Sequence, residues 1–289
     1  MKSLILVLIL NLFFSFQSLA NTYENGIYNG RSLETKSVFD LIDSVLPGDV
    51  LILGEFHGVE PHHRNQNYIL QQLAKRHSNL SVGMEFINFQ QQEIVDQYFE
   101  GELTEEDFLQ RMKWDNFKDY HFYRDLIAKP YLFSTGKTYG INAPRELTSK
   151  VAKTGLDSLN EKERALLPPN FNVGSDLYLG RFREAMGGHV PEEKLLKYFT
   201  AQSIWDDTMA YQILRHQKQN EVFVVIVGDF HASYGGGLKD RLVARGKAHE
   251  QIKILSQISR QHLYGKTIEQ MLNPRTMNGP RGDFIYITD

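Results

Sequence analysis

The sequence predicts an α/β fold: a mostly parallel sheet flanked by helices, with a smaller helical subdomain inserted into it. Short apolar runs alternate with stretches of helical periodicity, a pattern that favours an α/β sheet over a sandwich. Four of the apolar runs end in polar residues, as expected where strands of an open parallel sheet deliver side chains to a ligand site. With 42% hydrophobic and 12% aromatic residues, the chain can form a sizeable core.

The elements follow from these runs in chain order. A helix over residues 63–76 separates the first two strands, and Ile69, Leu70 and Leu73 form its apolar face. Because a strand, a helix of this length and a strand normally form a right-handed parallel unit, we expect a parallel sheet. The expected strands cover residues 50–53, 80–84, 138–141, 222–227, 252–255 and 284–288.

Long helical runs dominate the middle of the chain. They extend from about residue 90 to residue 215 and are interrupted only near Tyr139. We therefore expect much of this stretch to form a helical subdomain. The expected α/β core covers about 45–90, 135–150 and 205–289, and the helical insertion about 90–135 and 150–205.

The first 20 residues, MKSLILVLILNLFFSFQSLA, resemble a targeting segment. Lys2 precedes an apolar run, and Ser18-Leu19-Ala20 offers a small-residue cleavage site. The run is shorter than the roughly 20 apolar residues that a membrane span needs. We expect a signal peptide cleaved after Ala20, which leaves residues 21–289 as the mature chain.

The composition narrows the compartment and the partners. The chain has no cysteine, which excludes disulfides, thiolate metal sites and a lipidated cysteine. An exported chain without disulfides indicates a bacterial periplasm or cell envelope, and a protein that is not a lipoprotein. The net charge of −3 and the lack of a basic stripe give no reason to expect nucleic acid as a partner.

One short motif occurs twice. LILGEFHG spans residues 51–58 and VIVGDFHA spans residues 225–232, so Gly, an acid, Phe and His end two apolar runs. Glycine lets the backbone leave the sheet sharply or admits a ligand close to it. If the two strands are parallel neighbours, both motifs lie at one edge of the sheet and His57 and His231 share a site.

Polar residues that follow two further strands, and two polar residues on a helix, are expected in or beside the same crevice. Gln202 and Asp206 add two polar groups to the otherwise apolar face of a helix that includes Met209, and buried polar groups need partners. We expect them to orient one imidazole. His62 and His63 are expected at the rim. The residues expected in the crevice itself are Glu55, His57, Glu85, Asn142, Arg145, Asp229 and His231.

This set supports catalysis as one hypothesis. One imidazole acts as a general base on water, a carboxylate such as Glu55 or Glu85 orients it, and Arg145 stabilises an oxyanion. The same histidines and carboxylates could instead bind a divalent metal such as zinc or manganese, although no His-Glu-x-x-His helix supports this alternative.

A family resemblance supports a different hypothesis. The chain carries, in order, LILGEFHGVEPHH, VGMEF, INAPRE, AQSIWDDTMAYQI and VGDFHASYGGGLKDRL. From about residue 50 to residue 242, these stretches resemble the ChaN family of haem-binding, iron-regulated proteins, within a wider group that includes erythromycin esterase-like hydrolases. The resemblance implies a cell-envelope protein that holds haem between two protomers, with tyrosine as the axial ligand. The chain departs from lipoprotein members because no cysteine follows the signal segment.

The tyrosine cannot be chosen from composition, because the chain has 14 of them. A tyrosinate oxygen suits ferric haem iron. Tyr178, near the expected mouth of the helical domain, is the first candidate, and Tyr234, three residues after His231, is the second. Residues that could cover the porphyrin are Phe171, Leu177, Phe182 and Met186.

From the sequence we therefore expect an exported haem-binding protein of haem or iron acquisition that forms a homodimer on binding haem. Outer-membrane haem-uptake machinery is a candidate partner. The alternative is a hydrolase that uses Glu55, His57, Glu85 and His231, with Asp229, Gln202 and Asp206 in supporting places.

Overall fold

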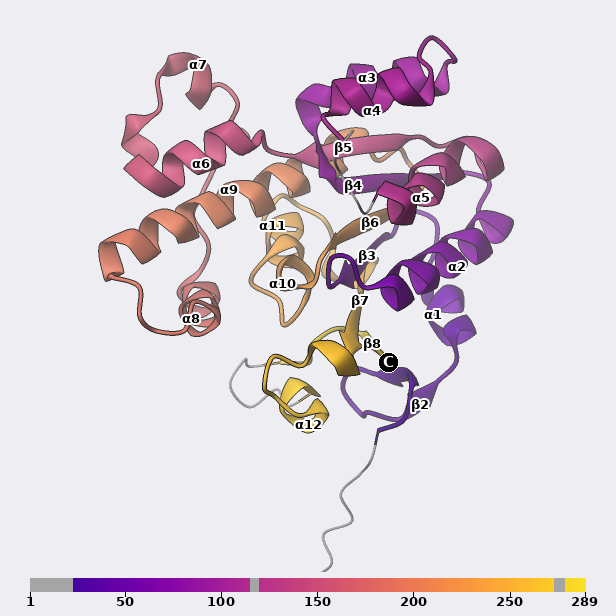
Figure 1. Cartoon of the computed structure of the whole chain (residues 1–289). Coiled ribbons are helices and arrows are strands. Elements are labelled where there is room, and N and C mark those ends of the chain that lie inside the picture. The colour runs from indigo at the N-terminus through magenta and orange to yellow at the C-terminus, as the bar shows by residue number, and fades with distance from the viewer. Residues whose placement is uncertain (1–22, 115–119, 273–278) are drawn as a thin grey trace, which may run out of the picture.

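A computed structural model describes residues 23–114, 120–272 and 279–289 and shows a mixed sheet of eight strands with helices on both faces (Figure 1). The strand order is β2-β1-β8-β7-β3-β6-β4-β5. From β8 to β5 all neighbouring strands are parallel, whereas β1 is antiparallel to β2 and β8. The strands are β1 (Gly26–Asn29), β2 (Thr35–Lys36), β3 (Val50–Glu55), β4 (Leu80–Asn88), β5 (Thr138–Asn142), β6 (Val222–Gly228), β7 (Ile252–Ser259) and β8 (Phe284–Thr288).

The α/β prediction is confirmed, and so are the existence and the order of the six expected strands. β4 and β7 continue four residues beyond their expected ends. The edge pair β1 and β2 was missed because short strands leave little periodicity to detect. The helices are α1 (Val38–Ser44), α2 (Glu60–Arg76), α3 (Gln92–Phe99), α4 (Glu105–Met112), α5 (Tyr120–Phe133), α6 (Arg145–Thr154), α7 (Glu161–Arg164), α8 (Asp176–Ala185), α9 (Glu192–His216), α10 (Asp229–Ala232), α11 (Leu238–Ala244) and α12 (Ile268–Leu272).

The two faces of the sheet bury different sets of helices, because successive side chains of a strand point to opposite faces. Leu51 and Leu53 of β3 pack in one core with α1, α2 and α5, whereas Val50 and Ile52 pack in another with α9 and α11. β3 and β6 are buried along their whole length. Their near-continuous apolar sequence is therefore that of strands covered on both sides.

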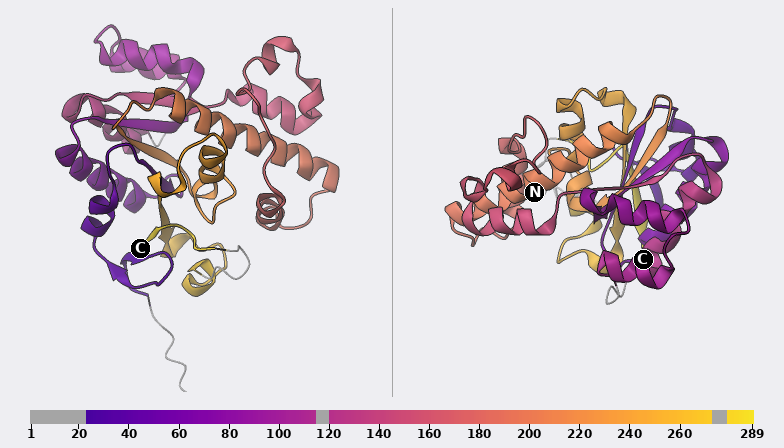
Figure 2. Two further views of the ribbon diagram at one scale, coloured as in Figure 1. Left: turned by 180° about the vertical axis from the view of Figure 1, so that it is seen from behind. Right: turned by 90° about the horizontal axis from the view of Figure 1, so that it is seen from above.

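The helical stretch of the chain divides into two parts. Val95 of α3, Phe108 of α4 and Leu126 of α5 belong to the same core as Leu51, so residues 92–133 share the core of the sheet wherever the structure describes them. By contrast, α6, α8 and the N-terminal half of α9 form their own apolar clusters and project from the sheet (Figure 2). The projecting helices therefore lie after β5, whereas α3, α4 and α5 pack on the sheet; the helical insertion expected at 90–135 and 150–205 stays a prediction.

The long helix α9 joins this projection to the sheet. Its C-terminal half packs Met209 and Ile213 on the sheet, and its N-terminal half packs Leu195 and Phe199 against α8.

The expected signal peptide, residues 1–20, lies outside the described residues. In the described ranges, no helix combines the length and the apolar character needed to cross a membrane.

Candidate functional site

The doubled motif lies at the carboxyl ends of two adjacent strands. β3 and β6 are parallel neighbours, and Glu55 of one pairs in register with Gly228 of the other. β4 lies on the other side of β6 and brings Glu85 to the same edge. The structure therefore brings His57, Glu85 and His231 together, as the repeated Gly-acid-Phe-His motif predicted.

The two motif glycines make this close approach possible. A Cβ at Gly228 would lie 2.9 Å from Nε2 of His57 and 3.4 Å from Oε2 of Glu85. A Cβ at Gly54 would lie 2.8 Å from Oδ1 of Asp229. Each glycine thus leaves space for a side chain of the neighbouring motif, which larger residues would displace.

His231 is buried between two carboxylates. Its Nδ1 lies 2.7 Å from Oδ1 of Asp206, and its Nε2 lies 3.5 Å from Oε1 of Glu85. Burial alone would lower the pKa of His231, but the charges of Asp206 and Glu85 outweigh it and raise this pKa to about 10. At neutral pH His231 is therefore a fixed imidazolium and cannot serve as the general base.

Glu85 is held as a carboxylate. Burial tends to raise the pKa of Glu85. The positive charges of His231 and His57 and the hydrogen bond from the Gly228 N–H outweigh burial and lower this pKa to about 2. The Gly228 backbone N–H donates to Oε2 at 2.6 Å. Gln202, the other polar residue of the α9 stripe, donates to the Tyr178 hydroxyl at 3.1 Å and lies against the His231 ring.

His57 is the accessible member of the cluster, with half of its side chain exposed. Its Nδ1 lies 3.0 Å from Oε1 of the buried Glu55, which also accepts bonds from Tyr123 at 2.5 Å and Gln66 at 2.7 Å. Burial lowers the pKa of His57, but the Glu55 bond and the charge of Glu85 prevail and raise it above its ordinary value. His57 is therefore the group of this cluster that exchanges a proton most readily with a ligand.

The acid of the second motif has a different role. Asp229 forms a buried ion pair with Arg281 and accepts a hydrogen bond from Ser256, not from a histidine. Arg281 also donates to the Ser256 hydroxyl at 2.6 Å. Neither Arg281 nor Ser256 was found from the sequence, because no motif surrounds them.

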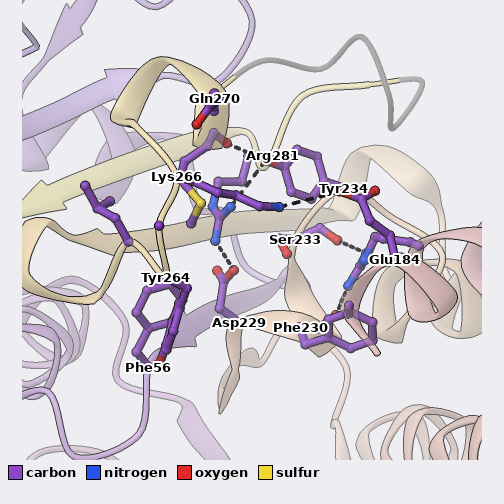
Figure 3. Close-up of a pocket in the computed structure, with 15 residues that line it drawn as sticks. Phe56, Glu184, Asp229, Phe230, Ser233, Tyr234, Tyr264, Lys266, Gln270 and Arg281 are labelled. Carbon is purple, nitrogen blue, oxygen red and sulfur yellow. Dashed lines mark hydrogen bonds and ion pairs between the residues drawn. The ribbon is translucent and has the colours of Figure 1, made fainter. Parts of the chain in front are cut away.

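The phenylalanines of both motifs line a pocket of about 770 Å³ next to the histidine cluster. Figure 3 shows Phe56 with Tyr264 on one side, Phe230 and Tyr234 on the other, and Asp229 with Arg281 between them. A volume of this size is typical of pockets for small molecules and cofactors. The doubled motif thus supplies its histidines to one site and its phenylalanines to the adjoining one.

Two tyrosines reach this pocket. Tyr264 is 77% exposed, packs on Phe56 with ring centroids 5.8 Å apart, and was not singled out from the sequence. The hydroxyl of Tyr234 donates to the Met271 carbonyl and accepts from Arg281 at 3.3 Å. Of the two phenol groups, that of Tyr264 is the more accessible to a ligand.

Tyr178, the first candidate for an axial ligand, lies elsewhere. It is 1% exposed and its hydroxyl donates to Oδ2 of Asp206 at 2.8 Å. Burial, together with the charge of Asp206, raises the pKa of this phenol well above its ordinary value. A phenol that is buried and bonded to a carboxylate would have to leave this arrangement before it could bind iron as a tyrosinate. Instead it positions Asp206 behind His231.

Two other expected site residues, Arg145 and Asn142, are not part of the cluster, whereas Nδ1 of His63 lies 3.4 Å from Oε2 of Glu55. Arg145 is exposed at the start of α6 and, within the described part of the chain, makes no hydrogen bond or ion pair with the cluster. Asn142 accepts a bond from the Ala143 N–H. The expectation that His62 and His63 lie at the rim is wrong, because both are buried in α2. Burial lowers the pKa of His62 to about 3, and its Nδ1 accepts the Phe56 N–H at 3.0 Å.

The metal alternative finds no support. Among the described residues, no group of three or more histidine, aspartate or glutamate side chains is arranged to hold a metal ion. The imidazoles of His57 and His231 are instead committed through Nδ1 to Glu55 and Asp206.

Comparison with known families decides the relationship. The family model described as "Haem-binding uptake, Tiki superfamily, ChaN" matches residues 41–242, which is more than half of the chain. The chain belongs to the ChaN family. The match covers both copies of the doubled motif and the Gln202–Asp206 stripe, while Tyr264 and Arg281 lie beyond its C-terminal limit.

A solved structure of a ChaN protein shares this fold. The ChaN of Campylobacter jejuni, solved with cofacial haem, superposes with a TM-score of 0.66 at 19% identity, covering 91% of this chain and 96% of that one. An erythromycin esterase variant in its open conformation gives a TM-score of 0.45 at 9% identity, covering 81% and 77% of the two chains. No curated protein sequence matches the chain.

Proposed function

We propose that this ChaN-family protein binds haem in the pocket between Phe56 and Phe230 and acts in haem or iron acquisition. The single observation that carries the proposal is that this pocket combines aromatic walls, cationic side chains and an accessible tyrosine. Aromatic faces suit a flat apolar macrocycle, cations suit its carboxylates, and a phenolate oxygen suits ferric iron. The family membership supports the same ligand.

Tyr264 is our proposed axial ligand, with Tyr234 as the second candidate. Tyr264 stands at the mouth of the pocket with its ring packed on Phe56. Tyr234 would have to give up its bond to the Met271 carbonyl before it could bind iron. When bound, the haem would supply the iron that the tyrosine ligates and the carboxylates that the cationic residues recognise.

The exposure of Tyr264 also supports a homodimer. A porphyrin held at the mouth of a pocket has one face against protein and leaves the other face in water, which is unfavourable. A second protomer with the same arrangement would cover that face through a twofold contact. We propose that haem drives this dimer, that the chain is exported with cleavage after Ala20 to the periplasm or cell envelope, and that outer-membrane haem-uptake machinery is its partner.

Tyr264→Phe should weaken hemin binding by at least about tenfold, because it removes the ligating oxygen and leaves the aromatic ring in place. The same variant should fail to dimerise at hemin concentrations that dimerise the wild type. Sedimentation velocity monitored at the Soret wavelength measures both properties at once.

The matched control is Tyr68→Phe, a partly exposed tyrosine of α2 outside the pocket, which should behave as the wild type. Tyr234→Phe tests the second candidate in the same assay. If the wild type binds no hemin, the proposed function is wrong. If Tyr264→Phe binds as tightly as Tyr68→Phe, another residue holds the iron.

The histidine cluster favours hydrolysis as a second function. His57 is half exposed and is oriented by the buried Glu55, which is the arrangement of a general acid or base. His231 stays cationic beside Glu85 and stabilises that carboxylate. The site lacks the oxyanion contact expected from Arg145, since that residue is exposed on α6.

If His57 is a general base, His57→Gln should lower kcat/KM for p-nitrophenyl acetate by about a hundredfold, the scale of general acid–base catalysis. It should leave hemin binding unchanged, because His57 does not line the haem pocket. The rate of the wild type should rise as His57 loses its proton, at a pH above the ordinary histidine pKa. Initial rates measured across pH test both points.

Exposed imidazoles attack activated esters without any active site, so the control must be another exposed histidine. His189, in the loop before α9, has this exposure and lies outside the cluster. His189→Gln should retain the wild-type rate. Equal rates for the two variants would show that the hydrolysis is background reactivity of histidine.

A further inference from the structure

The pocket contains a buried positive charge, that of Arg181, which forms no direct ion pair with a carboxylate of the described residues. Of its cationic residues, Arg281 pairs with Asp229 and Lys266 lies 3.6 Å from Glu184. Arg181 is 7% exposed and, in the three ranges that the structure describes, has no carboxylate within 4 Å. The charges of Asp229 and Asp206 act on Arg181 only from beyond ion-pair distance, so an anionic ligand group in direct contact would be attracted to this position.

The Arg181 guanidinium is held in a fixed orientation. It donates to the carbonyls of Phe230, Ser233 and Gly235, the last at 2.7 Å. Its central carbon lies 4.2 Å from the ring centre of Phe230 and 5.1 Å from that of Tyr178. Arginine has five N–H donors. These bonds leave the Nε–H and one Nη2–H without an acceptor in the described part of the chain.

We propose that Arg181 recognises a carboxylate of the ligand in this pocket, which for haem is a propionate. This inference rests on the proposed haem function and adds the residue that selects the charged edge of the porphyrin. A guanidinium with two unused donors can bind a carboxylate through two parallel hydrogen bonds, whereas a lysine offers a point charge. Arg181 is therefore a specificity-determining residue, separate from the tyrosine that ligates iron.

The test compares hemin with hemin dimethyl ester, in which both propionates are capped. The wild type should bind hemin at least about tenfold more tightly than the ester, because a charge-assisted hydrogen bond in a buried site contributes at this level. Arg181→Lys should reduce the ratio of hemin affinity to ester affinity several-fold, because it removes the paired N–H donors of the guanidinium while keeping the charge. Iron-free protoporphyrin IX should show the same dependence on Arg181, because it retains the propionates and lacks the metal.

Arg183→Gln is the matched control, since Arg183 lies on the same helix but is exposed and pairs with Glu192. It should preserve the wild-type ratio. If Arg181→Lys does not fold, as circular dichroism would show, the wild-type comparison can still overturn the proposal. Equal binding of hemin and its ester by the wild type would overturn the role of Arg181 and leave haem binding intact. Binding of neither ligand would instead refute the proposed function.

Discussion

Arg281→Met should lower the free energy of unfolding by about 3–5 kcal/mol, the usual effect of removing one partner of a buried ion pair. Arg281 is 4% exposed and is the ion-pair partner of the buried Asp229. Methionine fills much of the volume but cannot neutralise the carboxylate, which would remain buried beside Ser256. Urea unfolding followed by circular dichroism measures the change.

Two further variants separate the ion pair from general packing. The double variant Arg281→Met with Asp229→Leu should recover part of the loss, because it leaves no buried charge unpaired. Lys266→Met removes a half-exposed cation at the rim of the same pocket and should change stability by less than about 1 kcal/mol. If Arg281→Met proves as mild as Lys266→Met, Asp229 is not stabilised by its ion pair.

The second large effect is a loss of stability in alkali through His231. The folded protein raises the pKa of this residue from 6.5 to about 10, so the folded state binds the proton more tightly than the unfolded chain does. The resulting stabilisation is fully present below pH 6.5 and is lost as the pH rises through about 10. Its size is on the order of several kcal/mol, since each pKa unit corresponds to about 1.4 kcal/mol. Unfolding free energies measured between pH 6 and pH 10 should therefore decrease.

Asp206→Asn provides the control for this pH dependence. The amide keeps the shape of the side chain but removes the charge that holds the His231 proton, so stability should fall at pH 6 and vary less between pH 6 and pH 10. The Glu85 carboxylate affects stability in acid rather than in alkali, because its pKa is lowered from 4.5 to about 2. The stabilisation from this group is present above pH 4.5 and is lost as the pH falls through about 2. Parallel pH profiles for the wild type and Asp206→Asn would show that His231 is not the titrating group.

The histidine cluster could be predicted because its signal is local and repeated. Glu55 and His57 are two residues apart on one strand end, and His231 occupies the equivalent place on another. Parallel neighbouring strands bring such ends together, so repetition of the motif was enough to predict that His57 and His231 lie in one site. Asp206 could also be found, because a carboxylate on an apolar helical face needs a buried partner.

The aromatic pocket could not be predicted in the same way. Tyr264 and Arg281 come from segments after β7 and before β8, and no motif or periodicity distinguishes them. Tyr178, by contrast, was selected for its place near the helical projection, but the structure buries it against Asp206. Exposure of a tyrosine depends on which helices cover it, and that is a property of the assembled fold.

The amino-acid sequence by itself determined the α/β class, the order of the buried strands and the acid–histidine ends of β3 and β6. These features depend on apolar runs and on residues that are adjacent in the chain, so local patterns record them. Only the tertiary structure decided the partner of each acid: Glu55 binds His57, whereas Asp229 binds Arg281. The physical reason is that a buried charge is stabilised by whichever opposite charge the packing brings within reach, and in the second motif that charge comes from 52 residues away in the chain.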